Sequence, residues 1–548
     1  MPAIALLLGI QARFVLDDAF ISFHYARSLV EGDGLTWFGE RVEGYTNFGW
    51  VLWLAVGFAC GIEPVAWSQA SGIATFVGAT VLLWRIASSA SAGPLVPWVA
   101  TLGFVTNFSV HSFATSGLAT MPQTFFVLAA FRCAQRAGVG DAPFRALGGC
   151  SLFAALALWT RLDSAVLLAP IGLWALATIR RMPQTERLRA MLWLCLPIAA
   201  LVGGWLAWKL TYYGAWLPNS YTAKVRGSGW VSDGALQWAR FALWYSIAPV
   251  IVLFAATAAV LRSHLGTPPT SRPTLWMSFA LLFASFAYLA SVGGDFMEFR
   301  FLVPAAPYCY LAVGLLFDSV CDVTSGWGRT ALAGGTVLVL ALSSVQYGVT
   351  FHTDSNLRMD GIRQLGDFYG RYPDGRWDRI GSALEREFGA TAPTLAVSAA
   401  GAIPYYSRLE SVDLWGLNDR TIPTLGLVSE FRRPGHRHHA TFDYLRSRGV
   451  DLIIGDPALV ADADLVTVHR DRDFREWASR ALPAQESAPA QLDIVAMPID
   501  PGVHLLIWIF RSSPELESSI RGWPRWQIPY HAPSPAPHRG QHPGTRKE

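Results

Sequence analysis

Long apolar stretches are the feature that most constrains this chain. They recur between about residues 47 and 350, separated by short polar breaks. A helix rising about 1.5 Å per residue needs roughly 20 apolar residues to cross a hydrocarbon core of about 30 Å. The sequence therefore predicts a polytopic α-helical membrane protein. The expected apolar segments are 2–16, 47–62, 67–87, 95–115, 119–136, 146–160, 164–180, 190–211, 244–262, 275–292, 301–318 and 329–350.

The charge content supports a membrane protein and argues against a nucleic-acid-binding protein. Only 15% of the 548 residues are charged, against about 25% in average soluble proteins. The net charge of +3 and the lack of a basic stripe with interleaved aromatic residues argue against binding of nucleic acid. The six cysteines all lie in the apolar part without CxxC spacing, which is typical of small core residues.

Clusters of arginine indicate which ends of the predicted helices face the cytoplasm. The clusters lie in three connections between helices, and basic loops are expected on the cytoplasmic side. The loops at 161–163, 212–235 and 293–300, and everything after 350, are then external. If segment 47–62 lies at the outer interface, about eleven helices cross the membrane, with the N-terminus inside and the C-terminus outside. The cytoplasmic connections are marked by Arg132, Arg136 and Arg145, by Arg180, Arg181, Arg187 and Arg189, and by Arg262 and Arg272.

The first segment, 2–16, is short for a crossing and is interrupted by Arg13. Either a helical turn or two is missing from the start, or this helix barely spans. It lacks the basic start and cleavage pattern of a signal peptide.

The chain changes character after the apolar part. Residues 1–350 are expected to form the membrane domain. Residues 351–525 alternate strand-like runs at 394–399, 450–455 and 503–510 with helical or turn-rich stretches, which predicts a soluble α/β domain. Residues 526–548 are rich in Pro, His, Ser and Gly, and we expect them to be disordered.

Two adjacent carboxylates, Asp17 and Asp18, end the first apolar segment. A carboxylate pair beside hydrocarbon is costly, so it indicates a functional site. Further polar residues are predicted at the same outer face. They could instead be helix caps, interface anchors and snorkelling cations. These residues are His24, Glu43, Tyr45, Asn47, Arg161, Asp163, Asn219, Tyr221, Lys224, Asp295, Glu298 and Arg300.

Such an assembly suits transfer of a group from a lipid phosphate. A carboxylate can remove the proton of an acceptor hydroxyl as a general base. Cations such as Lys224 and Arg300 can neutralise a phosphate leaving group. Asp18 would position the acceptor or orient the base. Arg300 could instead pair with Asp295 or Glu298 as a structural clamp.

The C-terminal domain carries a second polar group. A Trp ring beside carboxylates and amides would suit an acceptor glycan, because the ring stacks on sugar C–H faces. The alternative is a strand-to-turn junction with a buried Trp. A zinc site in GHRHH (435–439) is disfavoured because a second ligand pair is missing. No cofactor is required, and a divalent metal is left open. The residues are Asp413, Trp415, Asn418, Asp419 and His436.

Several motifs resemble those of one family. DDAFISFHYAR (17–27) followed by GERVEGYTNF (39–48) resembles the first external loop of GT-C-fold integral membrane glycosyltransferases, in the branch of the mycobacterial terminal β-(1→2)-arabinofuranosyltransferases. The resemblance spans roughly residues 14–450, in order. Further agreements are SGLAT (116–120), TRLDS (160–164), YYGAWLPNSYTAK (212–224), GGDFMEFRFLVP (293–304), DLWGLNDR (413–420) and PGH (434–436).

The resemblance implies a catalytic membrane domain, a polyprenyl-phosphate sugar donor, inversion at the anomeric carbon and an external sugar-binding cap. It implies Asp17 as the base and favours arabinofuranose as the sugar. The chain departs from the family at Ala119, where an acidic residue is usual, and at His24, where Arg is usual. Leu162 and Ser164 flank Asp163 where the family has Pro and Gly. These departures put the sugar and the acceptor in question.

The expected function is transfer of a sugar to a cell-envelope glycan at the outer face of a bacterial plasma membrane. The main alternative is a transporter or flippase of polyprenyl-linked sugars. Transporters tend to show paired repeats and charges near the midplane, whereas the charges here gather at one face. A catalytically inactive scaffold is disfavoured by the retained Asp17 and Asp18. The sequence does not identify the sugar, the acceptor or the oligomeric state.

Overall fold

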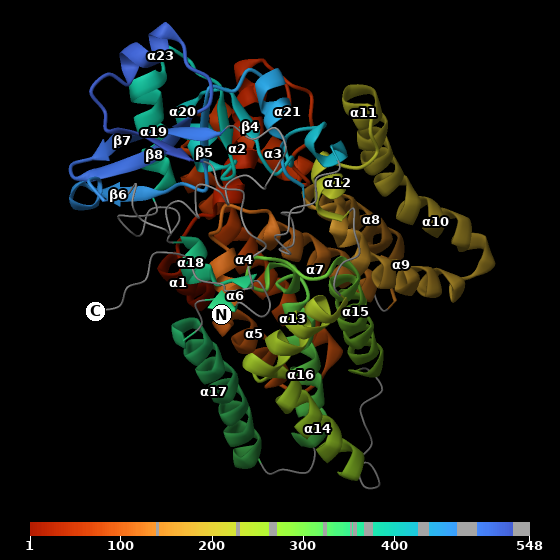
Figure 1. The fold of residues 1–548 in the computed structure, drawn as a ribbon. Coiled ribbons are helices and arrows are strands. Elements are labelled where there is room, and N and C mark those ends of the chain that lie inside the picture. The colour runs from red at the N-terminus through yellow and green to blue at the C-terminus, as the bar shows by residue number, and fades with distance from the viewer. Residues whose placement is uncertain are drawn as a thin grey trace. The chain divides into compact units, whose positions relative to one another are not determined.

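The chain folds into two compact units (Figure 1). The computed structural model describes residues 1–138, 142–225, 231–261, 271–321, 326–350, 353–354, 359–366, 376–425, 438–467 and 490–529. The first unit comprises Met1–Val15, Thr46–Trp216 and Gly227–Ile362, and the second Leu16–Tyr45, Leu217–Arg226 and Arg363–Glu548. Residues 16–45 and 217–226, which the sequence assigned to the membrane domain, therefore pack in the unit that contains the C-terminal sheet.

The first unit is mainly helical, and its apolar composition is that of a multi-pass membrane protein. Its helices are α1 (Pro2–Gln11), α3 (Phe48–Ala59), α4 (Pro64–Ala90), α5 (Val96–Thr106), α6 (Phe108–Phe113), α7 (Thr120–Ala137), α8 (Pro143–Thr160), α9 (Ala165–Arg180), α10 (Gln184–Ile198), α11 (Gly204–Tyr213), α13 (Val231–Trp244), α14 (Ile247–Leu261), α15 (Ser271–Val292), α16 (Ala306–Cys321) and α17 (Gly326–Thr350).

Five helical stretches among the described residues are long and apolar enough to cross a membrane. A sixth would be α13 with α14, which are bent by 71° at their junction. The figure of about eleven crossings stays a prediction. Helix α3 has 12 residues, so at about 1.5 Å per residue it is too short to cross. The interfacial position expected for segment 47–62 stays a prediction. The five stretches are Pro64–Ala90, Leu162–Arg180, Gln184–Tyr213, Pro273–Val292 and Gly326–Gly348.

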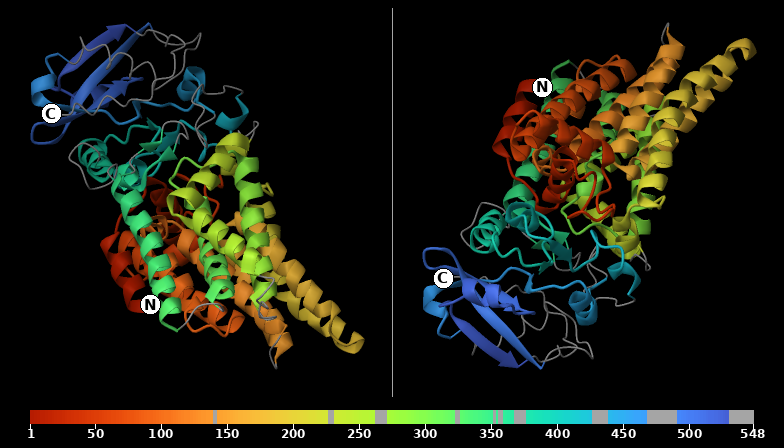
Figure 2. Two further views of the ribbon diagram at one scale, coloured as in Figure 1. Left: turned by 90° about the horizontal axis from the view of Figure 1, so that it is seen from below. Right: turned by 90° about the horizontal axis from the view of Figure 1, so that it is seen from above.

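Local chemistry explains a break in one predicted span and a change of helix type in another. Segment 95–115 forms α5 and α6 because the side chain of Asn107 accepts the Val110 N–H at 3.1 Å and caps α6. Segment 190–211 changes to a π-helix at Ala199–Gly203, just after Pro197, which has no N–H to donate. The indole of Trp159 donates to the Leu201 carbonyl within this π-helix at 3.2 Å. The long helix of residues 184–213 packs along α8 and lies at one side of the first unit (Figure 2).

The loop at 293–300 is held inside the first unit by a short pair of strands. β1 (Thr353–Asp354) pairs with β2 (Met359–Asp360) in antiparallel fashion. The backbone of Asp360 accepts the Glu298 N–H at 3.0 Å and donates to the Phe296 carbonyl at 2.7 Å. The carboxylate of Glu298 accepts the Ile362 N–H at 2.7 Å, at the start of α18 (Ile362–Gly366).

The second unit is built around a mixed sheet. Among the described residues the strand order is β4-β3-β5-β8-β7-β9, with β6 pairing with β8. β4, β3 and β5 run parallel, whereas the remaining pairs are antiparallel. The strands are β3 (Leu395–Val397), β4 (Ser411–Asp413), β5 (Leu452–Gly455), β6 (Leu459–Ala461), β7 (Gln491–Asp500), β8 (Val503–Ile509) and β9 (Arg525–Pro529).

Helices complete the second unit. They are α2 (Asp17–Glu31), α12 (Asn219–Val225), α19 (Trp377–Phe388), α20 (Ala402–Ser407), α21 (Phe442–Ser447) and α23 (Pro514–Ser519). Successive strand residues face opposite sides, so Leu395 and Val397 pack with α19 and α23, whereas Ala396 packs with α21. The prediction of a C-terminal α/β unit is confirmed. β9 includes residues 526–529, which corrects the expected start of the disordered tail; residues 530–548 lie outside the described residues.

Candidate functional site

Asp17 opens α2 and is bound by the backbone of the sheet domain. Its Oδ1 accepts the Ala402 N–H at 2.7 Å, and its Oδ2 accepts the Gly401 N–H at 3.1 Å. Both residues lie at the start of α20. Asp17 and Asp18 also occupy the first turn of α2, where a helix favours negative charge.

Burial raises the pKa of Asp17 from 3.8 to about 7. The Ala402 and Gly401 amides act in the opposite direction, because hydrogen bonds to a carboxylate favour its charged form. The negative charges of Asp18 and Asp413 raise the pKa further. A carboxyl group with a pKa near neutrality is suited to exchange a proton with a substrate hydroxyl.

Asp413, at the end of β4, is fully buried and holds the turn that follows it. Its Oδ1 accepts the Trp415 N–H at 3.0 Å. Its Oδ2 accepts both the backbone N–H and the side-chain amide of Asn418, at 3.0 and 3.1 Å. Burial raises the pKa of Asp413 to about 6, and these hydrogen bonds oppose the shift. Asp413 and Asn418 are therefore bonded within the domain, as in the alternative of a strand-to-turn junction.

Tyr25 joins helix α2 to this turn. Its hydroxyl lies 3.2 Å from Asn418 Oδ1 and 2.9 Å from the Val42 carbonyl, and it accepts the Gly44 N–H at 3.1 Å. Sequence reasoning missed this residue. Its place in the DDAFISFHYAR motif, seven residues after Asp18, was the available signal.

Asp419 is also engaged inside the domain. Its Oδ1 accepts the N–H groups of Thr421 and Ile422, at 2.8 and 3.0 Å. Its Oδ2 accepts from the hydroxyl of Tyr444 at 2.6 Å and from Arg448 at 3.1 Å. With four donors bound to its carboxylate, two on each oxygen, Asp419 stabilises the loop after β4.

Asn219, at the start of α12, fastens the 217–224 segment to the same loop. Its side-chain amide donates to the carbonyls of Gly416, Leu417 and Asp419 at 2.8, 2.9 and 2.9 Å. Its backbone N–H donates to the Glu43 carbonyl at 2.9 Å. Tyr221, two residues on, is exposed. Lys224 is in α12, but its side chain lies outside the described residues.

His24 is packed and uncharged near neutral pH. Burial, followed by the positive charge of Arg27, lowers its pKa to about 3. Its Nε2 accepts the Phe38 N–H at 3.4 Å, and its ring packs against Trp37 at 4.5 Å. Among the other predicted residues of this unit, Glu43 and Tyr45 are buried, and the Tyr45 ring contacts Tyr25 at 4.8 Å.

Trp415 is the half-buried member of the group proposed to bind the acceptor. Its ring meets His439 edge-on at 5.1 Å. His436 lies outside the described residues. Within the described ranges, no group of three or more His, Cys, Asp or Glu side chains could hold a metal ion.

The first unit contains the other predicted residues. Arg161 forms a bidentate ion pair with Asp163, with Nη2 2.6 Å from Oδ2 and Nε 3.0 Å from Oδ1. Gln123, which sequence reasoning missed, donates to Asp163 Oδ1 at 2.9 Å. The guanidinium of Arg161 also lies 5.4 Å from the centre of the Phe301 ring. Asn47 is buried at the start of α3.

Arg300 is bound to Asp295 in the same unit. Its Nε donates to Asp295 Oδ2 at 2.7 Å, and its Nη2 donates to Oδ1 at 2.9 Å. Gln237 fixes the backbone of Asp295 by donating to its carbonyl at 2.7 Å and accepting its N–H at 3.0 Å. Both side chains of the ion pair are buried. This geometry favours the structural clamp over phosphate binding for Arg300.

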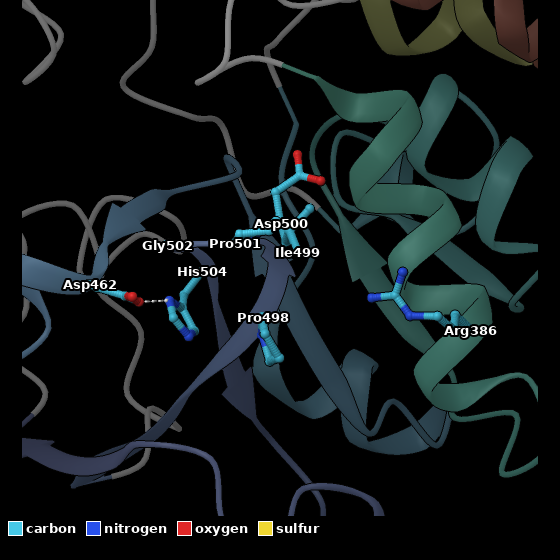
Figure 3. A pocket seen from close by; sticks show the side chains of 8 residues that line it. All are labelled: Arg386, Asp462, Pro498, Ile499, Asp500, Pro501, Gly502 and His504. Carbon is cyan, nitrogen blue, oxygen red and sulfur yellow. Dashed lines mark ion pairs between the residues drawn. The ribbon is translucent and has the colours of Figure 1, made fainter.

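A separate open hollow lies on the second unit (Figure 3). His504 and Asp462 face each other there, with His504 Nδ1 3.2 Å from Asp462 Oδ1. The turn between β7 and β8 forms another part of the wall, and Arg386 from α19 completes it. None of these residues belongs to the predicted site. The lining residues are Arg386, Asp462, Pro498, Ile499, Asp500, Pro501, Gly502 and His504.

A family model described as a domain of unknown function (DUF8728) matches residues 367–496. No curated protein matches the sequence at a significant level.

Solved structures resemble the chain over most of its length. The crystal structure of ArnT from Cupriavidus metallidurans bound to undecaprenyl phosphate has a TM-score of 0.55 and 12% identity, and the match covers 93% of this chain and 97% of ArnT. The apo state of ArnT has a TM-score of 0.52 and 13% identity, with 92% and 96% covered.

The arabinofuranosyltransferase AftD from Mycobacteria has a TM-score of 0.50 and 14% identity. That match covers 93% of this chain and 39% of AftD. These structural neighbours are GT-C glycosyltransferases. The chain is therefore similar in fold to the GT-C glycosyltransferases, as a multi-pass membrane protein with a C-terminal sheet domain.

Proposed function

We propose that this protein is a glycosyltransferase that moves a sugar from a polyprenyl-phosphate donor to a cell-envelope glycan. The observation that carries the proposal is the environment of Asp17, a partly buried carboxyl group whose pKa is raised to about 7 at the start of α2. The fold likeness to ArnT, which has been solved with undecaprenyl phosphate, supports a polyprenyl-phosphate donor. The likeness to AftD makes arabinofuranose the first sugar to test.

In the proposed reaction Asp17 is the general base. Its carboxylate takes the proton of an acceptor hydroxyl as that oxygen bonds to the anomeric carbon of the donor sugar. The bond between that carbon and the phosphate oxygen breaks with inversion, and polyprenyl phosphate leaves. Asp18 positions the acceptor or orients the base. Lys224 serves the leaving phosphate, because a cation stabilises the negative charge that develops there.

The acceptor glycan is assigned to the loop after β4. Trp415 is the residue of this loop that we expect to stack on a sugar ring, since it is half-buried. Asp413, Asn418 and Asp419 hold the loop in shape through hydrogen bonds to its own backbone and side chains. The reaction is placed at the outer face of a bacterial plasma membrane, following the positions of the basic loops.

A panel of donors tests this function. Purified full-length protein would be incubated with polyprenyl-phosphoryl arabinofuranose, mannose or another pentose, each with an oligosaccharide acceptor. Release of polyprenyl phosphate that depends on the acceptor is the expected result. Binding of donors without turnover, or movement of an intact donor across proteoliposomes, would instead support the flippase. The fold likeness to glycosyltransferases does not favour that alternative.

A further inference from the structure

The approach of Asp17 to the turn before α20 is unusually close. A Cβ atom built on Gly401 would lie 2.1 Å from the Asp17 carbonyl oxygen and 2.5 Å from its Cγ. Real Cβ contacts are essentially never under 3.0 Å. Residue 401 must therefore be glycine for the two segments to keep these positions.

We propose that Gly401 is a positioning residue for Asp17: the lack of a side chain at 401 lets two consecutive backbone amides bind the carboxylate and hold it in its reactive orientation. The inference rests on the proposed function of Asp17 as the base. Gly401 does not contact the substrate in this role. It acts through the amides of Gly401 and Ala402.

The two amides do more than fix a direction. One donates to each carboxylate oxygen, at 3.1 and 2.7 Å, so the carboxylate cannot rotate without losing a hydrogen bond. Both amides oppose the rise in the pKa of Asp17 caused by burial and by the nearby charges of Asp18 and Asp413. Without these hydrogen bonds the carboxyl group would keep its proton to higher pH. A smaller fraction of the protein would then have the ionised carboxylate that acts as a base at neutral pH.

Aromatic contacts and a hydrogen bond join α2 to α20 around this contact. Phe20, one turn after Asp17, contacts the rings of Tyr405 and Tyr406 in α20 at 5.4 and 5.5 Å. Arg27 donates to the Tyr405 carbonyl at 2.9 Å. The contacts of Phe20 and Arg27 join α2 to Tyr405 and Tyr406 of α20, so moving α20 to make room for a side chain at 401 would disrupt them.

The first test is Gly401→Ala in the full-length protein. Its turnover should fall by about 100-fold, the effect expected of a misplacement of about 1 Å, and the midpoint of the pH dependence of kcat/KM should move to higher pH. The control is Gly172→Ala, because a Cβ at that helical position meets nothing within 4 Å. Any result without an upward shift of the midpoint would overturn the proposal.

A second variant covers the case in which Gly401→Ala does not fold. Ala402 is the first residue of α20, a position where proline is tolerated in helices. Ala402→Pro removes the donor of the 2.7 Å hydrogen bond, adds no side chain at 401, and puts the ring Cδ where the N–H faced Asp17 Oδ1. It should also raise the pH midpoint. An unchanged midpoint in folded Ala402→Pro would overturn the proposal as well.

A readout that does not depend on activity separates the two hypotheses. Carbodiimides modify protonated carboxyl groups, so the extent of modification of Asp17 at each pH, measured by peptide mass spectrometry, follows its titration. The midpoint should lie near 7 in the unchanged protein and higher in both variants. If Asp17→Asn remains active, the proposed base is wrong. If Asp17→Asn is inactive but neither variant shifts the midpoint, only the role of Gly401 is wrong.

Discussion

Arg300 and Asp295 form a buried bidentate ion pair, in which two guanidinium nitrogens meet two carboxylate oxygens at 2.7 and 2.9 Å. An arginine held in this way is committed to its partner. Arg300 is the first residue of η3 (Arg300–Leu302), and Asp295 lies in the loop before it, which is also hydrogen-bonded to Asp360 of β2. We therefore assign Arg300 a structural role in the first unit. Lys224 remains the residue that we propose to bind the donor phosphate.

Arg300→Met should destabilise the protein by about 3–5 kcal/mol, the usual cost of leaving one buried charge without its partner. Thermal denaturation in detergent would measure the loss. The double variant Arg300→Met with Asp295→Leu should recover part of it, because neither charge then remains. Unchanged stability with weaker donor binding would instead return Arg300 to the phosphate.

Asp17→Asn should reduce turnover by about 10²–10⁴-fold, the usual effect of losing a general base. The amide has nearly the shape of the carboxylate but does not take up a proton. Turnover of the variant would be measured with the donor that the panel identifies. Near-normal turnover would show that Asp17 is not the general base. Thermal denaturation of the same preparation would check that the variant is folded.

The pH dependence of activity should follow the pKa of Asp17. Because burial raises that pKa to about 7, kcat/KM should increase with pH up to about 7 and then level. The carboxylate is the active form, so the sign is a rise with pH. A profile that is flat between pH 5 and 8, in roughly the interval where the group titrates, would contradict the assignment.

Stability should change with pH in the opposite direction. The folded state binds the Asp17 proton more tightly than the unfolded state, whose pKa is near the ordinary 3.8. The contribution of Asp17 to stability is therefore largest at low pH and is lost as pH rises from about 4 to about 7. The denaturation temperature of the unchanged protein, measured relative to that of Asp17→Asn, should therefore fall as pH rises across this range.

Asn219→Ala should lower stability by about 1–3 kcal/mol, since it leaves buried carbonyl groups of the loop after β4 without their donor. Its neighbour supplies a matched control. The hydroxyl of Ser220 is buried and has no hydrogen-bond partner among the described residues, so Ser220→Ala should be neutral or stabilising. Equal denaturation temperatures for the two variants would contradict the anchoring role of Asn219.

Single cysteines would test the orientation. Ser518 is exposed in α23 and Thr185 is exposed at the start of α10. In a background without the native exposed Cys60 and Cys195, Ser518→Cys should react with an impermeant maleimide in intact cells whose outer envelope is permeable to it. Thr185→Cys should react only after lysis. The reverse pattern would place the proposed site in the cytoplasm.

The sequence predicted the elements whose evidence is local. The runs 394–399, 450–455 and 503–510 contain β3, β5 and β8, because short apolar β-branched runs favour strands. It also identified the polar residues of the loop after β4. It could not show that Asp413, Asn418 and Asp419 accept or donate hydrogen bonds inside their own turn, since a side chain's direction depends on the folded backbone.

Contacts between residues far apart in the chain could not be predicted from the sequence pattern. The assignment of residues 16–45 to the sheet-containing unit depends on contacts such as those of Tyr25 with Asn418 and of Trp37 with the Ser411 carbonyl. No periodicity links positions so far apart. The same holds for Gly401, whose importance is visible only once Asp17 lies against it.

The hydrogen bond between Asp17 and Ala402 joins residues separated by 385 positions. At a synthesis rate of about 5–20 residues per second, helix α2 would wait roughly 20–80 s for the segment that completes its packing. During that interval the buried faces of Phe20, Phe23 and Tyr25 have no sheet to cover them. The first helix of the second unit therefore carries uncovered aromatic faces until the chain beyond residue 402 has been synthesised.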